Sequence, residues 1–184
     1  MGKILNVILS TLIVSCLCAC NSNGCLDNQN SIPLAGFYSM STKQPVTVSQ
    51  MQIGGVGAPN DTLLLSSGSA SEIYLPFRAT TDETSFYFRL VPTATDGEDT
   101  KPEPIYDTIT FKYKTTPYFA SSECGAMFQY EITEYSHTSL FIDSVAVTDS
   151  LITNVDIQRI QIYFHDSSSD NDDSNGLSTA SNGI

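Results

Sequence analysis

The sequence contains no tryptophan and only two histidines, His137 and His165. Because histidine is the commonest general base in enzymes, this scarcity weakens an enzymatic interpretation. Basic residues are also few: 8 Lys and Arg stand against 20 Asp and Glu, a formal net charge of -12. A surface of that sign repels nucleic-acid phosphates and anionic membrane faces, so we set nucleic-acid binding aside.

Recognisable catalytic and metal-binding motifs are missing as well. The sequence has no Gly-x-Ser-x-Gly, His-Glu-x-x-His or phosphate-binding loop. Its cysteines and histidines do not show the spacing of a zinc site. The segment Asn171–Gly176 loosely resembles a calcium loop, but it starts with Asn and has Asn182 where such a loop carries Glu. The sequence therefore predicts a protein without metal or cofactor that is not an enzyme.

Helical periodicity is absent, and residues 46–165 instead alternate between apolar and polar positions. Thr, Tyr, Phe, Ile and Val, the residues that favour strands, dominate this region. It predicts an all-β fold: an antiparallel, immunoglobulin-like β-sandwich of roughly eight strands, with a small β-barrel as the alternative. The expected strands are Val46–Ile53, Asp61–Ser66, Glu72–Phe77, Ser85–Val91, Ile105–Lys114, Gly125–Tyr135, Leu140–Asp149 and Ile157–Phe164.

Three details of this alternation can be checked in a structure. Asp107 falls on the apolar face of its strand, so we expect it at the rim of the sheet. The inward positions shift from Leu140 and Ile142 to Val145, which predicts a β-bulge near Asp143. Arg159 is expected to point outward in the last strand.

The N-terminus has the layout of a bacterial secretion signal. Lys3 precedes the apolar run Ile4–Val14, and small residues and a cysteine follow. The run is shorter than the about 20 apolar residues that a transmembrane helix needs. We therefore predict a signal peptide at residues 1–19.

The segment Leu17-Cys-Ala-Cys20 resembles the lipobox of bacterial lipoproteins, although Cys18 stands where a smaller residue is usual. The resemblance implies that Cys20 is lipidated and becomes the mature N-terminus. Cys16, after Ile13-Val-Ser15, is an alternative lipidation site. An ordinary cleaved signal, or a buried N-terminal helix, is the other interpretation that remains open.

If Cys20 carries the lipid, the mature chain keeps two further cysteines, Cys25 and Cys124. An even pair in an oxidising compartment predicts a disulfide. The alternative is a pair of free, buried thiols.

Composition divides the rest of the chain. Residues 20–45 are predicted to be a linker with an irregular first strand at Leu34–Ser39, and residues 46–165 the β-sandwich domain. Residues 166–184 are Ser, Asp, Asn and Gly with almost no apolar side chain, which predicts a disordered acidic tail.

Aromatic side chains are the remaining candidates for a binding surface. Most of them alternate along strands, which favours a role in the core. Tyr118 and Phe119, which follow Pro117, are the pair that we expect to be exposed and available for contact. The others considered are Tyr74, Phe77, Tyr87, Tyr106, Tyr113, Tyr130 and Tyr163.

Three groups of segments together resemble a known family: Ile73–Phe77, then Tyr106–Tyr113 leading into Ser121–Gly125, and finally Ile142–Val145 with Ile160–Ile162. The family is one of small lipoproteins of unknown function from the phylum Bacteroidota, domain-of-unknown-function family 6452. The resemblance covers most of residues 25–165. It implies a single envelope domain and carries no mechanism.

These observations favour a lipid-anchored cell-envelope protein that has a non-enzymatic structural or partner-binding role. Its partners would be the membrane, through the lipid, and an envelope protein or glycan. A glycan- or small-ligand-binding lipoprotein is the alternative, and an envelope hydrolase is the least favoured. Because the flank Asn21–Gly24 carries no acidic residue, we expect the protein on the periplasmic side of the outer membrane.

Overall fold

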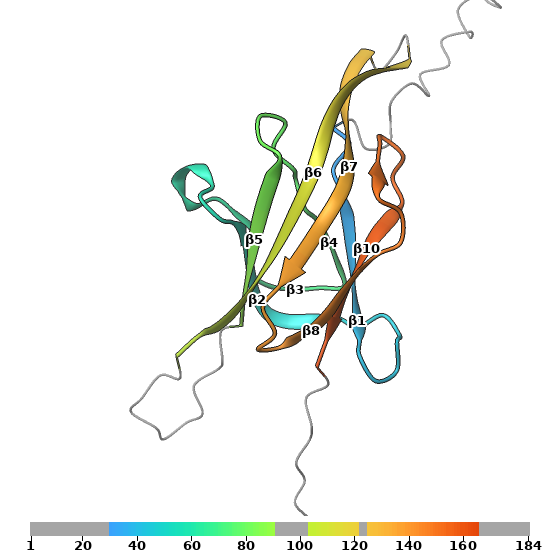
Figure 1. The fold of residues 1–184 in the computed structure, drawn as a ribbon. Helices are drawn as coiled ribbons and strands as arrows, with labels where there is room; N and C mark the ends of the chain where they lie inside the picture. The colour runs from blue at the N-terminus through green and yellow to red at the C-terminus, as the bar shows by residue number, and fades with distance from the viewer. Residues whose placement is uncertain (1–29, 91–102, 122–124, 166–184) are drawn as a thin grey trace, which may run out of the picture.

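The computed structural model describes residues 30–90, 103–121 and 125–165, and in this part of the chain it contains two β-sheets (Figure 1). The first sheet has the strand order β4-β1-β10-β8 and the second the order β3-β2-β5-β6-β7-β9. The strands are β1 (Leu34–Ser39), β2 (Val48–Gly55), β3 (Leu63–Ala70), β4 (Glu72–Tyr74), β5 (Glu83–Leu90), β6 (Ile105–Ser121), β7 (Gly125–His137), β8 (Ile142–Val147), β9 (Leu151–Ile152) and β10 (Gln158–Phe164), with a short 3-10 helix at Pro59–Asp61.

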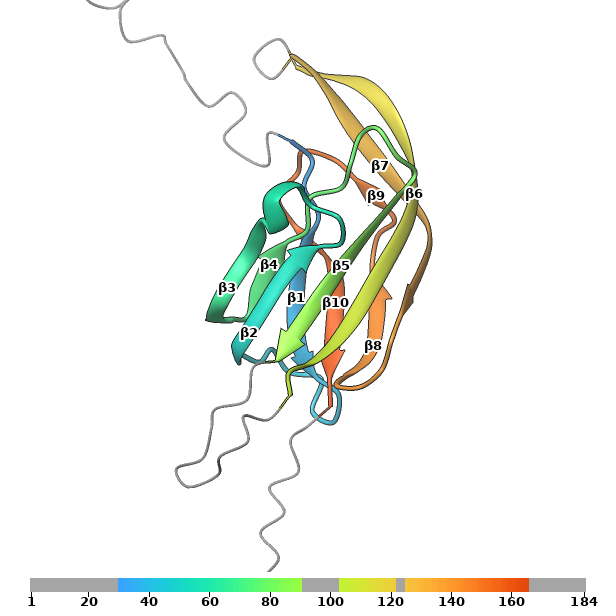
Figure 2. The ribbon, with the colours of Figure 1, turned by 90° about the vertical axis from the view of Figure 1, so that its left-hand side faces the viewer.

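The prediction of an all-β fold is confirmed, and the two sheets face one another as layers (Figure 2). The expectation of purely antiparallel pairing is wrong at one place, because β1 and β10 run parallel. The first strand, which was expected to be irregular, lies between β4 and β10, and its register with β10 shifts between Leu34 and Ala35. Ala35 and Phe37 of β1 are fully buried, which explains why this strand lies inside the sheet and not at its edge.

The core fills the space between the layers. In the six-stranded sheet Phe86, Phe88, Ile109 and Phe111 point inward, as the alternation predicted, and all are almost completely buried. Phe37 of the four-stranded sheet contacts rings from both layers. Its ring centroid lies 6.5 Å from that of Phe88 in the facing sheet and 5.2 Å from that of Phe164 in its own sheet. Edge-to-face rings of this kind stabilise a core beyond their buried area.

The bulge predicted in the eighth strand is confirmed. Tyr163 pairs with Ser144 and Phe164 pairs with Ile142, so Asp143 has no partner in the register. The extra residue changes which side chains face inward. One expectation fails here: Leu140 is 65% exposed, whereas Phe141 is buried.

Two charged residues are more buried than the sequence indicated. Asp107 lies near the start of β6, as expected for a rim position, but its side chain is fully buried. Arg159 was expected to point outward and is buried. Its guanidinium contacts the Asp149 carboxylate at 3.2 Å and donates to the carbonyl of Val155 at 3.0 Å, so the connection between β8 and β10 lies against it.

Candidate functional site

Part of the predicted site lies outside the described residues. Cys20, the predicted lipidation site, and Cys25 and Cys124, the predicted disulfide pair, all fall there. Among the residues that are described, none forms a helix with the length and apolar character needed to span a bilayer. Nor do three or more His, Cys, Asp or Glu side chains gather around a metal position in that part of the chain.

The most prominent feature is the hairpin of β6 and β7. The two strands pair from Ile109 and His137 to Ser121 and Gly125. β5 pairs with β6 only as far as Lys112. β9 pairs with β7 at Tyr130 and Glu131. Beyond these residues the hairpin is a two-stranded ribbon that projects past the sandwich (Figure 2).

The sequence predicts that β6 ends at Lys114, before Pro117. Proline lacks the N–H group that a central strand needs, so it normally marks a strand end or an edge. Pro117 nevertheless pairs with Phe128. It is tolerated because β5 begins at Glu83, opposite Lys112, and does not extend along this part of β6.

Tyr118 and Phe119, the predicted contact pair, are both on this ribbon and have different surroundings. Phe119 is 70% exposed, the largest value among the exposed large hydrophobic residues of the described chain. Tyr118 is half-buried, and its hydroxyl donates to Asn154 Oδ1 at 2.8 Å and accepts from the Asn154 N–H at 3.2 Å. Only Phe119 of the pair is thus freely presented, while Tyr118 joins the ribbon to the β9–β10 connection.

Phe128 is a surface residue, although its alternation with Tyr130 and Ile132 predicts an inward position. Direct cross-strand partners project from the same face of a ribbon. Phe128 therefore shares a face with its partner Pro117, and the alternation along β6 adds Phe119 to that face. It is 45% exposed. The apolar alternation of Phe128 with Tyr130 and Ile132 is the sequence signal for this face, and the sequence does not show that the face continues beyond the core.

The exposed face begins where the core ends. Phe77 stacks on Tyr113 at 4.4 Å between ring centroids and packs edge-on against Tyr130 at 5.6 Å. These three rings form the outermost aromatic layer of the core, and burial raises the pKa of the Tyr130 hydroxyl. Phe119 and Phe128 lie farther along the hairpin, beyond this layer.

Several titratable groups lie near the end of the sandwich opposite the ribbon. Burial acts to raise the pKa of the Asp107 carboxyl, but hydrogen bonds from the β7–β8 connection and the start of β8 together outweigh it and hold the pKa below its ordinary value. His137 Nε2 donates to the backbone carbonyl of Asp143 at 3.1 Å. The Asp143 carboxylate lies 3.5 Å from the ring of His165. His137 therefore contacts the backbone of Asp143, whose carboxylate lies beside His165.

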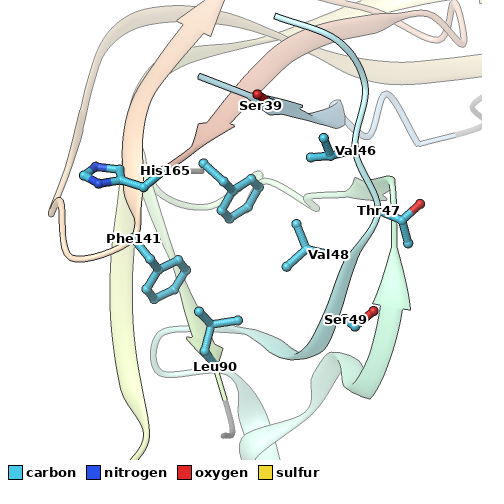
Figure 3. A pocket seen from close by; sticks show the side chains of 9 residues that line it. Ser39, Val46, Thr47, Val48, Ser49, Leu90, Phe141 and His165 are labelled. Atoms are coloured by element: carbon cyan, nitrogen blue, oxygen red, sulfur yellow. The ribbon is translucent and has the colours of Figure 1, made fainter. Parts of the chain in front are cut away.

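A pocket of about 460 Å³ opens between the sheets at this opposite end (Figure 3). Val46, Val48 and Leu90 point into it. The rings of Phe141 and Phe164, stacked 6.2 Å apart between centroids, form a further wall. Ser39, Thr47, Ser49 and His165 supply the polar part of the lining. The lining is suited to a small, mainly apolar molecule with a polar group.

A shallower hollow of about 390 Å³ lies on the outer face of the six-stranded sheet. Tyr87, Arg89 and Tyr106 contribute to its lining. The Tyr87 ring lies directly over Gly54, where a Cβ atom would meet the hydroxyl at 2.5 Å. A side chain at position 54 would therefore displace the ring.

Comparison with known families identifies the chain. A model of the family of unknown function DUF6452 matches residues 50–164, which is more than half of the sequence and reaches from within β2 to the end of β10. The core strand β1 lies outside the matched range. No curated protein and no solved structure gives a match. The chain belongs to the family of unknown function DUF6452.

Proposed function

We propose that this chain is a lipid-anchored protein of the bacterial cell envelope with a non-enzymatic, partner-binding or structural role. In this proposal Cys20 carries the lipid in the outer membrane, and the domain faces the periplasm. The signal-like N-terminus and the segment Leu17–Cys20 support the anchor, and the flank Asn21–Gly24 supports the periplasmic side.

One observation supports the binding role above all: the apolar end of the β6–β7 hairpin. Phe119 and Phe128 are 70% and 45% exposed on a ribbon that projects beyond the sandwich. Large apolar side chains gathered on a projecting element are typical of interaction surfaces. We propose that this ribbon contacts another component of the envelope.

The anchor is tested by the intact mass of the mature protein purified from native membranes. The expected species begins at Cys20, carries a diacylglycerol group, and is two hydrogens lighter than the reduced form because of the Cys25–Cys124 disulfide. A full-length chain with five reducible thiols would contradict the proposal. A lipid on Cys16 would support the location in the envelope and assign the lipid to Cys16 in place of Cys20.

The binding role is tested by a photo-crosslinking amino acid placed at position 119 in living cells. Position 140 is the matched control, because Leu140 is 65% exposed and lies in the β7–β8 connection, away from the ribbon tip. We expect an adduct with an envelope component from position 119 and none from position 140. Equal labelling at both positions, or none at 119, would contradict a role for the ribbon.

The pocket between the sheets favours a second candidate, small-ligand binding. Its apolar interior of Val46, Val48 and Leu90 fits an apolar molecule better than a glycan, because sugars need many hydrogen-bond partners. Val48 points into the pocket and is half-buried, so Val48→Trp should obstruct the pocket, whereas Thr47→Trp, on the side that points away from it, is the matched control. Native mass spectrometry of the natural protein and both variants from envelope extracts would show a ligand lost only in Val48→Trp, and a glycan array without hits would exclude the glycan form.

A further inference from the structure

We propose that the end of the domain formed by the β6–β7 ribbon and the β9–β10 connection lies against the surface of the lipid bilayer. This inference rests on the proposed function, because it takes the lipid on Cys20 as given. It names the envelope component that the ribbon contacts: neutral phospholipid at the boundary between headgroups and acyl chains.

Exposed apolar side chains gather at this end of the molecule. Contacts link the elements that carry them: the Tyr74 hydroxyl donates to Asp156 at 2.9 Å, and Tyr118 on the ribbon bonds to Asn154 in the same connection. Leu151 pairs with Glu131, beside the ribbon. The large hydrophobic residues of this end surface, each at least 40% exposed, are Tyr74, Phe119, Phe128, Leu151, Val155 and Ile157.

The chain arrives from the predicted anchor at the same end. β1 begins at Leu34, which pairs with Tyr74 and with Gln158, the neighbour of Ile157. Figures 1 and 2 both show the beginning of β1 at the end of the sandwich from which the ribbon projects. Ten residue steps separate Cys20 from Asn30, and a fully extended chain of that length spans about 35 Å. The anchor therefore keeps the end surface near the bilayer.

Charge favours neutral lipid over a polar partner. From Thr115 to Tyr130 the sequence contains a single charged residue, Glu123, although the whole chain carries a net charge of -12. Two carboxylates of the end surface have partners, since Asp156 accepts from Tyr74 and Asp149 pairs with Arg159. Aromatic side chains on an uncharged segment are characteristic of the membrane interface.

The absence of tryptophan makes a direct test possible, because one introduced Trp is a unique reporter. We would place it by Phe119→Trp in the full mature lipoprotein, with Leu140→Trp as the control. Both proteins are reconstituted into phosphatidylcholine vesicles whose acyl chains carry bromine near the headgroup. Phe128→Trp serves as a second reporter if the F119W protein does not fold.

We expect the emission of the F119W protein to shift to shorter wavelength on reconstitution and to be quenched by bromine. The L140W protein should show neither effect. Phe119→Ser should weaken vesicle binding of the mature-length chain, residues 20–184 with Cys20→Ala, by about tenfold, since the side chain loses its apolar burial.

Two results would overturn the inference and leave the proposed function intact. One is a lipidated, vesicle-bound F119W protein whose emission bromine does not quench. The other is emission already shifted before vesicles are added, which would indicate that another segment of this chain or a second copy covers the ribbon. If the natural mature protein carries no lipid and does not bind vesicles, both the proposed function and this inference are wrong.

Discussion

The carboxylate of Asp107 in β6 accepts the backbone N–H of Phe141 at 2.8 Å, in the connection between β7 and β8. The same carboxylate accepts the hydroxyl of Thr138 at 2.6 Å and the N–H groups of Leu140 and Ile142 at 2.9 and 2.8 Å. A fully buried anion thus replaces water as the partner of several backbone groups. It fixes Phe141 in the core, where the chain crosses from one sheet to the other.

Asp107→Asn should destabilise the fold by about 3 kcal/mol, because an amide removes one acceptor and turns a donor toward backbone N–H groups. Urea unfolding of the variant and the natural protein measures the difference. Asp82→Asn is the matched control, because Asp82 is an exposed residue of the β4–β5 connection. A loss no larger than that of the control would show that the carboxylate does not organise this connection.

Stability should also depend on acid pH through Asp107. Its folded pKa lies below the ordinary value of 3.8, so the carboxylate contributes its full stabilisation above that value. The contribution is lost as the pH falls through the lower, folded pKa. Unfolding free energies measured from neutral pH to acid should decline more steeply in the natural protein than in Asp107→Asn. The slope that remains belongs in part to Asp149, whose pKa is lowered by hydrogen bonds from Leu151 and Arg159.

Tyr113 joins β6 to β5 and to the β4–β5 connection through its hydroxyl. The hydroxyl lies 2.6 Å from Thr84 Oγ1, donates to the carbonyl of Arg78 at 3.0 Å and accepts its N–H at 3.0 Å. Tyr113→Phe should cost about 1–2 kcal/mol, since these groups lose a buried partner. Thermal unfolding measures the loss, and Tyr106→Phe, on a ring that is 61% exposed, should change little.

The contact between Tyr118 and Asn154 is expected to hold the ribbon against the β9–β10 connection. Tyr118→Phe should lower the global stability by less than about 1 kcal/mol, because the bond is partly exposed. It should instead accelerate hydrogen exchange in the outer half of the hairpin and around Asn154. A double mutant with Asn154→Ala should add nothing further. Unchanged exchange in Tyr118→Phe would show that the ribbon is held by other contacts.

The predicted disulfide has its own test. Closing a loop of about 100 residues between Cys25 and Cys124 stabilises the folded state by up to about 4–5 kcal/mol in the chain-entropy model. Cys25→Ser, Cys124→Ser and the double variant should therefore lose the same amount, and reductant should have no effect on any of them. Free thiols that titrate in the natural protein would argue for the alternative of two unpaired cysteines.

Sequence reasoning reached some features of the fold and missed others for identifiable reasons. The inward positions of β5, β6 and β10 followed from alternation, because a strand places every second side chain on one face. Ile105 at the start of β6 is the exception, since it is 44% exposed. The bulge at Asp143 followed from a shift in that alternation. The outer half of β6 was not predicted, because the alternation of apolar and polar residues stops after Lys114. Strand β9 was missed because its two residues carry too little pattern to detect.

The sequence by itself determined the all-β class, the inward faces of the main strands and, through residues 50–164, membership in the family DUF6452. These depend on local periodicity and residue type. Only the tertiary structure decided that Asp107 and Arg159 are buried, that β1 runs parallel to β10, and that Phe128 is a surface residue. Each of these depends on what the opposite sheet or a distant connection covers. Local alternation sets the face on which a side chain lies, and the extent of the facing layer determines whether that face is core or surface.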